Sequence, residues 1–329
     1  MATLGANVLT LADWAKRLDP DGKTSSIVEL LSQSNEILDD MLFMEGNLPT
    51  GHRTTVRTGL PSVSWRLLNQ GVSPSKSTTA QVEDACGMLE AWSEVDVELA
   101  KLNGNSASFR LSEAQAFIEA MSQEAASTIF YGNAGTAPEE FTGFAPRYNA
   151  LGQNVISGGG SQSDNSSVWL ICWGAQTIHG IFPKGSKAGL DHKDHGEVTV
   201  ETTAGIAGSR MRAFQDQWTW KLGLSVRDWR YAVRICNIDV SNLVAKSSAA
   251  DLFDLMIKAI HRVPSLNMGR CAFYMNRSVH QMLDIQSRDD VQSGGQLGYQ
   301  NVEGKPVLSF RGIPIRKCDA LTETEATIS

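Results

Sequence analysis

Hydrophobic residues near the N-terminus fall on one stripe at helical spacing. Between Ile27 and Met41 they recur every three or four positions, which predicts an amphipathic helix. Gly46 and Pro49 follow this stripe and predict where the helix ends. We therefore expect residues 1–48 to form a helical arm.

A second and longer helical stripe begins near residue 111. Ser112 is a candidate N-cap with Gln115 as its capping-box partner, and Gly132 is a stop signal. The stripe is narrow and rich in alanine, which is typical of a helix that lies on a sheet. We expect Ile118 and Met121 to be core residues of this helix.

Between the two helical stripes the pattern changes to alternation. Apolar and polar residues alternate from Leu89 to Leu99 and also from Val63 to Leu67. The segment between them, residues 69–79, carries almost no large apolar side chain. The pattern predicts a long β-hairpin with a polar tip.

The predicted length of this hairpin can be compared with the size of the body that would have to cover it. Its first strand, about 16 residues, would span about 50 Å when extended. A compact chain of 329 residues has a radius of gyration of only about 20 Å. Such an arm is too long to be covered by its own body, so we expect neighbouring molecules to bury it.

The second half of the chain mixes short strands with capped helices. Alternation from Trp218 to Val226, a turn at Asp228 and a return from Tyr231 to Ile235 predict an antiparallel hairpin. Further strands are expected at 168–173, 177–182, 198–202, 271–275 and 307–310, and helices after Asp251 and Asn276. The fold class predicted from these elements is α+β, rich in antiparallel strands.

Composition limits the function classes. Hydrophobic residues make up 42% of the chain and charged residues 20%, which supports a buried core. The net charge of -7 argues against a protein whose main function is to bind nucleic acid. Five cysteines without a C-x-x-C pair predict apolar filler rather than a disulfide framework. We expect neither a signal peptide nor a membrane span.

Candidate chemistry is sparse. The loop from Gly180 to Lys187 has serine before lysine, which is the wrong order for a phosphate-binding loop. His192, His195 and Glu197 form a metal-like cluster, although a solvated polar loop explains the same residues. We therefore expect no cofactor, no bound metal and no catalytic site.

Three motifs, in this order along the chain, carry a family resemblance. They are FTGFAPRYN at 141–149, CAFYMNRSVHQML at 271–283 and FRGIPIRKCDAL at 310–321. Together with the order of elements, they resemble the major capsid proteins of tailed bacteriophages that have the HK97-like fold. FTGFAPRYN is similar to the GLAPRYN stretch of a podovirus-like group, and the resemblance covers nearly the whole chain.

The resemblance implies a domain organisation. An N-terminal helical arm (1–48) would precede an extended β-hairpin called the E-loop (49–100). A peripheral domain with a long spine helix (101–155) and a mainly axial domain with some peripheral strands (156–305) would follow. Closing strands and a C-terminal tail (306–329) would end the chain.

The same resemblance implies partners and a location. Copies of the chain would assemble in the bacterial host cytoplasm into hexamers and pentamers of the virion shell, with the E-loop lying over a neighbouring subunit. A separate scaffolding protein, a portal and a cement or decoration protein are the further partners. The shell would enclose double-stranded DNA without sequence-specific binding and without a membrane.

The hairpin itself supplies the candidate interface residues. We expect Trp65 to be an apolar anchor and Arg57 and Arg66 to be charges at its rim, with Arg53 and Lys76 in the same interface. Two alternatives remain open at this point. One is a metal-dependent hydrolase centred on His192, His195 and Glu197, and the other is a monomeric β-rich binding protein.

Overall fold

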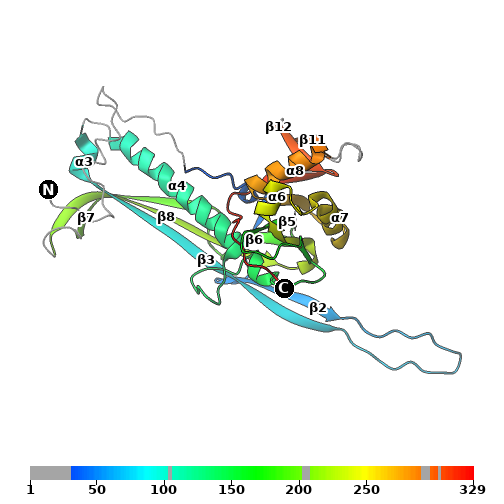
Figure 1. Cartoon of the computed structure of the whole chain (residues 1–329). Helices are drawn as coiled ribbons and strands as arrows, with labels where there is room; N and C mark the ends of the chain where they lie inside the picture. The colour runs from blue at the N-terminus through cyan, green and yellow to red at the C-terminus, as the bar shows by residue number, and fades with distance from the viewer. Residues whose placement is uncertain (1–30, 103–105, 202–207, 290–296, 303–304) are drawn as a thin grey trace.

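The computed structural model describes residues 31–102, 106–201, 208–289, 297–302 and 305–329. Within these ranges no helix is both long and apolar enough to cross a membrane. Figure 1 shows a body of helices and strands from which one long hairpin projects at one end and a narrower arm of strands at the other.

Runs of strands and runs of helices follow one another along the described chain, as expected for a mixed α+β fold. Their order is α2 (Ile37–Asp40), β1 (Phe43–Glu45), β2 (Gly51–Gly59), β3 (Thr78–Asp96), α3 (Val97–Lys101), α4 (Ser106–Tyr131), α5 (Phe144–Arg147), β4 (Val155–Ser157), β5 (Asn165–Trp173), β6 (Ile178–Phe182), β7 (Leu190–Glu201), β8 (Arg210–Val226), the 3-10 turn η2 (Trp229–Tyr231), β9 (Ala232–Asp239), α6 (Val240–Ala245), α7 (Leu252–Arg262), the 3-10 turn η3 (Leu266–Met268), β10 (Arg270–Met275), α8 (Arg277–Asp289), β11 (Leu297–Val302), β12 (Lys305–Phe310) and β13 (Ile313–Lys317).

The strands join into one branched sheet. Its main path runs β11-β12-β13-β10-β5-β6-β8-β3-β2, with β7 on the side of β8 and β9 on the side of β5. The path begins in the body and ends in the projecting hairpin, so the body and the hairpin share backbone hydrogen bonds. A force on the hairpin is therefore transmitted directly to the body.

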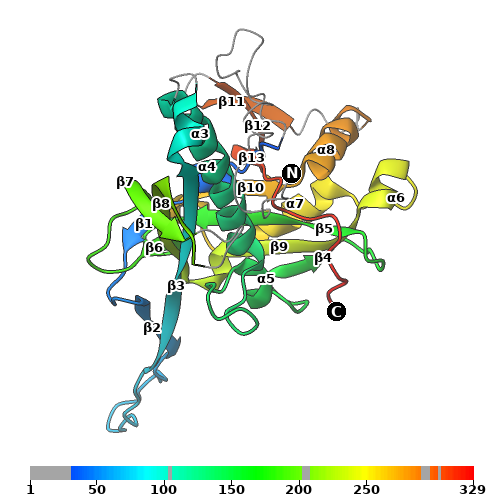
Figure 2. The ribbon, with the colours of Figure 1, turned by 90° about the vertical axis from the view of Figure 1, so that its left-hand side faces the viewer.

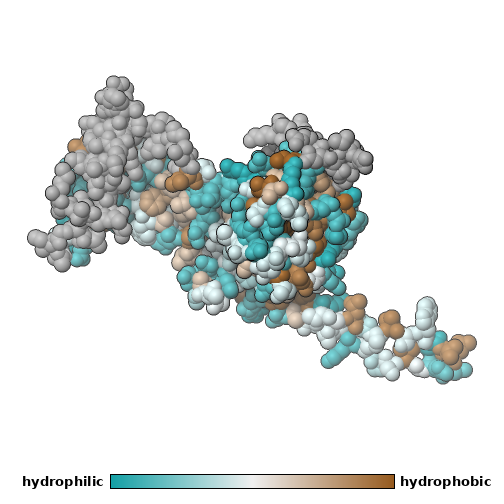
Figure 3. Space-filling model, viewed as in Figure 1, coloured by the Kyte–Doolittle hydropathy of each residue, from teal (hydrophilic) through white to brown (hydrophobic). Residues whose placement is uncertain are grey.

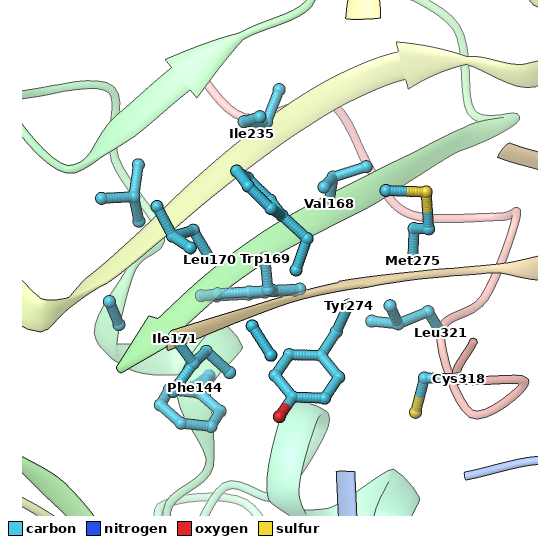
Figure 4. Close-up of a cluster of buried hydrophobic side chains, with 14 of the residues drawn as sticks. Phe144, Val168, Trp169, Leu170, Ile171, Ile235, Tyr274, Met275, Cys318 and Leu321 are labelled. Carbon is cyan, nitrogen blue, oxygen red and sulfur yellow. The ribbon is translucent and has the colours of Figure 1, made fainter. Parts of the chain in front are cut away.

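The core lies around β5, β9 and β10. Every residue of β5 and of β9 is buried, as expected for strands covered on both faces. Their buried polar residues are hydrogen-bonded where they meet, as Arg234 is to Ser167. Trp169 of β5 is completely buried and packs edge-on against Tyr148 and at a tilt against Phe144. Figure 4 shows Trp169 among Val168, Leu170, Ile235 and other apolar side chains of neighbouring strands.

The predicted hairpin from Trp218 to Ile235 is wrong. Strand β8 pairs with β3, β6 and β7, whereas β9 pairs with β4 and β5. The turn η2 carries the chain from one part of the sheet to another instead of reversing it in place. The cause is burial: β9 must be covered on both faces, and the edge of β8 is already taken by β3 and β7.

The predicted long hairpin is present as β2 and β3, paired antiparallel from Gly51 with Ala85 to Gly59 with Thr78, and we refer to it below as the E-loop. Figures 1 and 2 show it extending well beyond the body. The alternation predicted from Leu89 onward is present up to the end of β3, with Ser93 and Val95 buried, whereas the residues from Val97 onward form α3 instead of strand. The strand predicted at 63–67 is wrong, because residues 60–77 have no partner strand to supply backbone hydrogen bonds.

The long helix predicted from the second stripe is α4, which begins at Ser106 and therefore before its predicted start. Ser112 is not its N-cap: its hydroxyl donates to the Phe109 carbonyl inside the helix, at 2.8 Å. Met121 is buried as predicted, but Ile118 is 42% exposed, so its assignment to the core is wrong. Phe117, rather than Ile118, packs against the sheet, where its ring stacks on that of Trp218 of β8.

The predicted helix through Met41 is correct only at residues 37–40, and residues 1–30 lie outside the described structure. The segment after α2 turns into β1, which pairs in parallel with β6. Asp40 explains this docking, because its carboxylate accepts from Arg316 and from the Tyr274 hydroxyl, each at 3.0 Å. These contacts hold the segment on the body rather than as a free arm.

Other local predictions are confirmed with one correction. Asp251 caps α7 and Asn276 caps α8, as their positions before the apolar stripes indicate. The cysteines were expected to be mostly apolar filler, and Cys172 and Cys271 are the exception. They lie opposite each other in the β5–β10 pair and form a disulfide.

Candidate assembly interface

The E-loop tip, which we define as residues 60–77, is the most exposed apolar surface of the described chain. Its large apolar side chains are almost fully exposed: Leu60 81%, Val63 91%, Trp65 103%, Leu67 67% and Leu68 93%. Figure 3 shows these residues as brown patches along the projecting hairpin. A stable monomer rarely exposes apolar side chains in such a group, so the tip is typical of a contact surface.

The charge of the E-loop tip is of one sign. Between Thr54 and Val82 the sequence has Arg57, Arg66 and Lys76 but no aspartate or glutamate. Arg66 donates to the Gln70 carbonyl at 2.7 Å, which closes the turn of the tip. The tip is therefore a basic and apolar surface on a chain whose total charge is negative.

All five predicted interface residues are exposed, but they form two groups. Trp65, Arg66 and Lys76 belong to the tip, whereas Arg53 and Arg57 lie on β2, between the body and the tip. Arg53 forms an ion pair with Glu83 across the hairpin. That they contact a second subunit stays a prediction.

The root of the E-loop is held by a buried polar cluster. His52 of β2 lies opposite Asp84 of β3, and His179 of β6 lies opposite Ser225 of β8. The Asp84 carboxylate accepts hydrogen bonds from Arg147 at 2.8 Å and from Ser225 at 3.0 Å. The residue is buried, with an exposed fraction of 3%. The cluster joins the projecting hairpin to the body through charge-assisted hydrogen bonds.

His179 is unusual in this cluster. The side chain is completely buried, its ring lies 5.8 Å from that of His52, and neither ring nitrogen has a hydrogen-bond partner among the described residues. Burial, with further contributions from Arg227 and His52, lowers the pKa of His179 to about 4. Burial also lowers the pKa of His52, again with a contribution from Arg227.

This lowered pKa predicts an acid-sensitive subunit. The unfolded histidine takes up a proton below about pH 6.5, whereas the folded one resists protonation until about pH 4. Stability is thus fully present above pH 6.5 and is lost as the pH falls towards 4, by about 2 kcal/mol at pH 4.5. The free energy of unfolding of unassembled subunits can be measured in urea at pH 7 and at pH 4.5. Between these two pH values it should fall by about 2 kcal/mol less in His179→Leu than in the unsubstituted chain.

The exposed His261 supplies the matched control. His261→Leu should keep the full loss of stability on acidification, because its side chain is exposed rather than buried. An equal loss in His179→Leu and in the unsubstituted chain would contradict the assignment.

The metal-like cluster does not converge on one point. His192 lies 3.0 Å from Asp216 and stacks on Trp218, whereas His195 lies 3.1 Å from Gln217 and stacks on Trp92. Glu197 forms ion pairs with Lys101 and Arg212. All three are on strand β7 rather than in a loop, and no group of ligands that could hold a metal occurs among the described residues.

Two buried ion pairs were not predicted from the sequence. Arg147 to Asp84 joins residues 63 positions apart, and Arg234 to Glu325 joins residues 91 positions apart. The second pair ties the C-terminal tail to β9, and Glu325 also accepts from the Tyr131 hydroxyl at 2.6 Å. The available signal was Arg234 itself, a basic residue between the apolar residues Val233 and Ile235 of a buried strand.

Comparisons with known proteins agree with this arrangement. Residues 19–329 match the family model described as major capsid protein GP7. No curated protein sequence matches the chain. One chain of the cryo-EM structure of bacteriophage Epsilon15 is 33% identical, with 100% of this chain and 99% of that chain covered and a TM-score of 0.80.

A more distant structure has the same fold. The capsid of bacteriophage JBD30 matches with a TM-score of 0.51 at 9% identity, over 91% of this chain and 96% of that one. These matches confirm the fold class expected from the sequence motifs.

Proposed function

The chain belongs to the major capsid protein GP7 family, and on that premise we propose that its copies form hexamers and pentamers that close into the head of a tailed bacteriophage. The observation that carries this proposal is the E-loop, whose apolar tip no part of the described chain covers. Repetition of one such contact around each capsomer would bury every tip.

We propose that the E-loop tip lies on the neighbouring subunit. Its exposed side chains include a tryptophan and several leucines, which are the residue types that anchor interfaces. Its basic charge favours an acidic partner surface, and the rest of the chain supplies one, because the whole molecule carries -7 despite the basic tip. The two groups of predicted interface residues would then serve different parts of one contact.

Trp65→Ala tests this proposal. Burial of one tryptophan stabilises a contact by about 2–3 kcal/mol, so removal should raise the subunit concentration needed for assembly by about tenfold or more. The free energy of unfolding of the unassembled subunit should not change, because Trp65 is fully exposed there. Sedimentation would measure assembly, and urea unfolding would measure stability.

Val244→Ala is the control, since Val244 of α6 is also exposed, at 58%, but lies outside the tip. Equal assembly of Trp65→Ala and the unsubstituted chain would contradict the role of the tip.

We further propose a structural rather than a catalytic role within the virion. A separate scaffolding protein, a portal and a decoration protein remain proposed partners, and assembly in the host cytoplasm is proposed with them. Enclosure of double-stranded DNA without sequence-specific contact is consistent with the acidic net charge, because tight phosphate binding needs clustered lysine and arginine.

The two alternatives are less well supported. A hydrolase would need His192, His195 and Glu197 to converge, whereas each has separate partners. A monomeric binding protein would leave the E-loop tip permanently in water.

A further inference from the structure

The disulfide between Cys172 and Cys271 lies at a junction of the sheet. The two cysteines are opposite residues of the antiparallel pair β5–β10 and lie 99 positions apart in the sequence. The main path of the sheet runs from β13 through β10 to β5, so strands β11 to β13 join the rest of the sheet through this pair. Figure 2 shows β10 between β13 and β5. The disulfide therefore fastens one part of the sheet covalently to the other.

Glycines next to the disulfide fix how β5 and β10 meet. A Cβ on Gly174 would lie 2.9 Å from the Met268 carbonyl oxygen, and a Cβ on Gly269 would collide with the Trp173 carbonyl oxygen. Such a close approach of two backbones needs glycine, and it holds the register of the pair. A reduced chain in this register would keep its two thiols side by side, in position to form the bond.

The two sulfurs differ in their access to solvent. Cys172 is completely buried in the main core, whereas Cys271 is only half-buried. The Sγ of Cys271 lies 3.5 Å from the Leu266 carbonyl oxygen of η3, a surface turn in which Leu266 is 37% and Met268 is 51% exposed. A dissolved reagent therefore has access to Cys271 and not to Cys172.

We propose that Cys271 is the site at which a small-molecule disulfide reacts with the reduced chain, and that Cys172 then displaces the adduct to close the β5–β10 junction. In the first step the Cys271 thiolate attacks one sulfur of oxidised glutathione, and one glutathione thiolate leaves. In the second step the Cys172 thiolate attacks the Cys271 sulfur, the protein disulfide forms and the second glutathione thiolate leaves. The two thiol protons of the protein pass to the two leaving thiolates, and the small disulfide is the oxidant.

Reduction of the closed disulfide should be slow in the folded subunit. A reductant meets the Cys271 sulfur, so the Cys172 sulfur has to leave as a thiolate inside the apolar core. Burial disfavours a charged thiolate, and a poor leaving thiolate slows the exchange. The junction, once closed, is therefore expected to stay closed while the subunit is folded.

This chemistry gives the junction two states in the life of a particle. Disulfides are rare in a reducing cytoplasm, so a subunit that folds and assembles there would carry the two thiols. An oxidising medium outside the cell would then close the junction in finished shells. This timing rests on the proposed function, whereas the order in which the two sulfurs react does not.

The three free cysteines serve as internal references. Cys236 and Cys318 are completely buried, and burial raises the pKa of both thiols, to about 12 for Cys318. Cys86 is half-buried, and burial, with a contribution from Asp84, raises the pKa of its thiol to about 11. Because the thiolate is the reactive form, all three should react slowly with a small disulfide.

A trapping variant tests the order of the two steps. Reduced and unassembled Cys172→Ala is treated with oxidised glutathione at about pH 8, and the adduct is located by peptide mass spectrometry. Glutathione should accumulate on Cys271, because no thiol lies opposite to displace it. The matched variant Cys271→Ala should carry at least about tenfold less glutathione on the buried Cys172.

Pulse alkylation tests the same order on the unsubstituted chain, without any change to the core. A short pulse of iodoacetamide on the reduced, folded subunit should label Cys271 at least about tenfold faster than Cys172, Cys236 or Cys318. In urea the rates should become similar. Closing the disulfide with oxidised glutathione should then raise the thermal unfolding midpoint of the subunit by about 5 °C or more. Cys271→Ala should show no such rise.

The outcomes separate this inference from the proposed function. Labelling of Cys172 as fast as or faster than Cys271, or an unsubstituted chain that remains a dithiol in oxidised glutathione, would overturn the inference and leave assembly untouched. Thiol counts on shells test the timing, and a disulfide already closed in shells purified under reducing conditions would contradict it. Failure of the chain to assemble would contradict the proposed function and not the order of reaction.

Discussion

Ile129→Asp is expected to prevent the subunit from folding. Ile129 of α4 is completely buried in the main core, beside the equally buried Phe130 and Ala126. An aspartate there would place a charge without a partner among apolar side chains, at a cost of several kcal/mol. That cost is a large part of the total stability of a protein, which is about 5–15 kcal/mol.

The same helix offers a matched control. Ile118→Asp makes the identical change at a position that is 42% exposed, so its charge stays in water. This variant should remain soluble, with its thermal unfolding midpoint within a few degrees of that of the unsubstituted chain. Soluble yield and circular dichroism measure both variants. A folded Ile129→Asp, or an insoluble Ile118→Asp, would show that the wrong face of α4 is assigned to the core.

The second large effect is expected at the C-terminal tail. Glu325 and Arg234 form an ion pair at 2.8 Å, and the exposed fractions of their side chains are 6% and 5%. Glu325→Ala would leave the guanidinium of Arg234 buried against Trp169 without its carboxylate. Loss of one partner from a buried pair costs about 3–5 kcal/mol. Urea unfolding of the subunit should show a loss of this size.

A double variant separates the charge from the packing. Arg234→Met with Glu325→Leu removes both charges and should be more stable than Glu325→Ala alone, because no unpaired charge remains. A loss below about 1 kcal/mol in Glu325→Ala would mean that the tail does not hold the body together.

Local pattern predicted the elements that depend on local physics. Alternation around Ser93 and Val95 identified the second strand of the E-loop because one face of β3 packs under α4. Asp251 and Asn276 identified helix starts because an N-cap needs only the next few backbone N–H groups. The polar tip predicted for the hairpin is only partly correct, because residues 60–68, which were expected to be its first strand, add exposed apolar side chains such as Trp65 and Leu68 to the tip.

Pattern could not predict features that depend on distant parts of the chain. Strands β8 and β9 look like a hairpin, yet which strand lies beside each is decided by burial of β9 on both faces. Ile118 fits the helical stripe, but the sheet beneath α4 meets Phe117 instead, through Trp218. The partners of Arg147 and Arg234 lie far away in sequence, so only the fold brings them together.

Electron microscopy of the purified, concentrated chain tests the central claim most directly. The account predicts hexamers, tubes or closed shells, in which the E-loop tip of each subunit, with Trp65 at its centre, is covered by the next subunit. Monodisperse single subunits at every concentration, with the E-loop tip left in solvent, would contradict it.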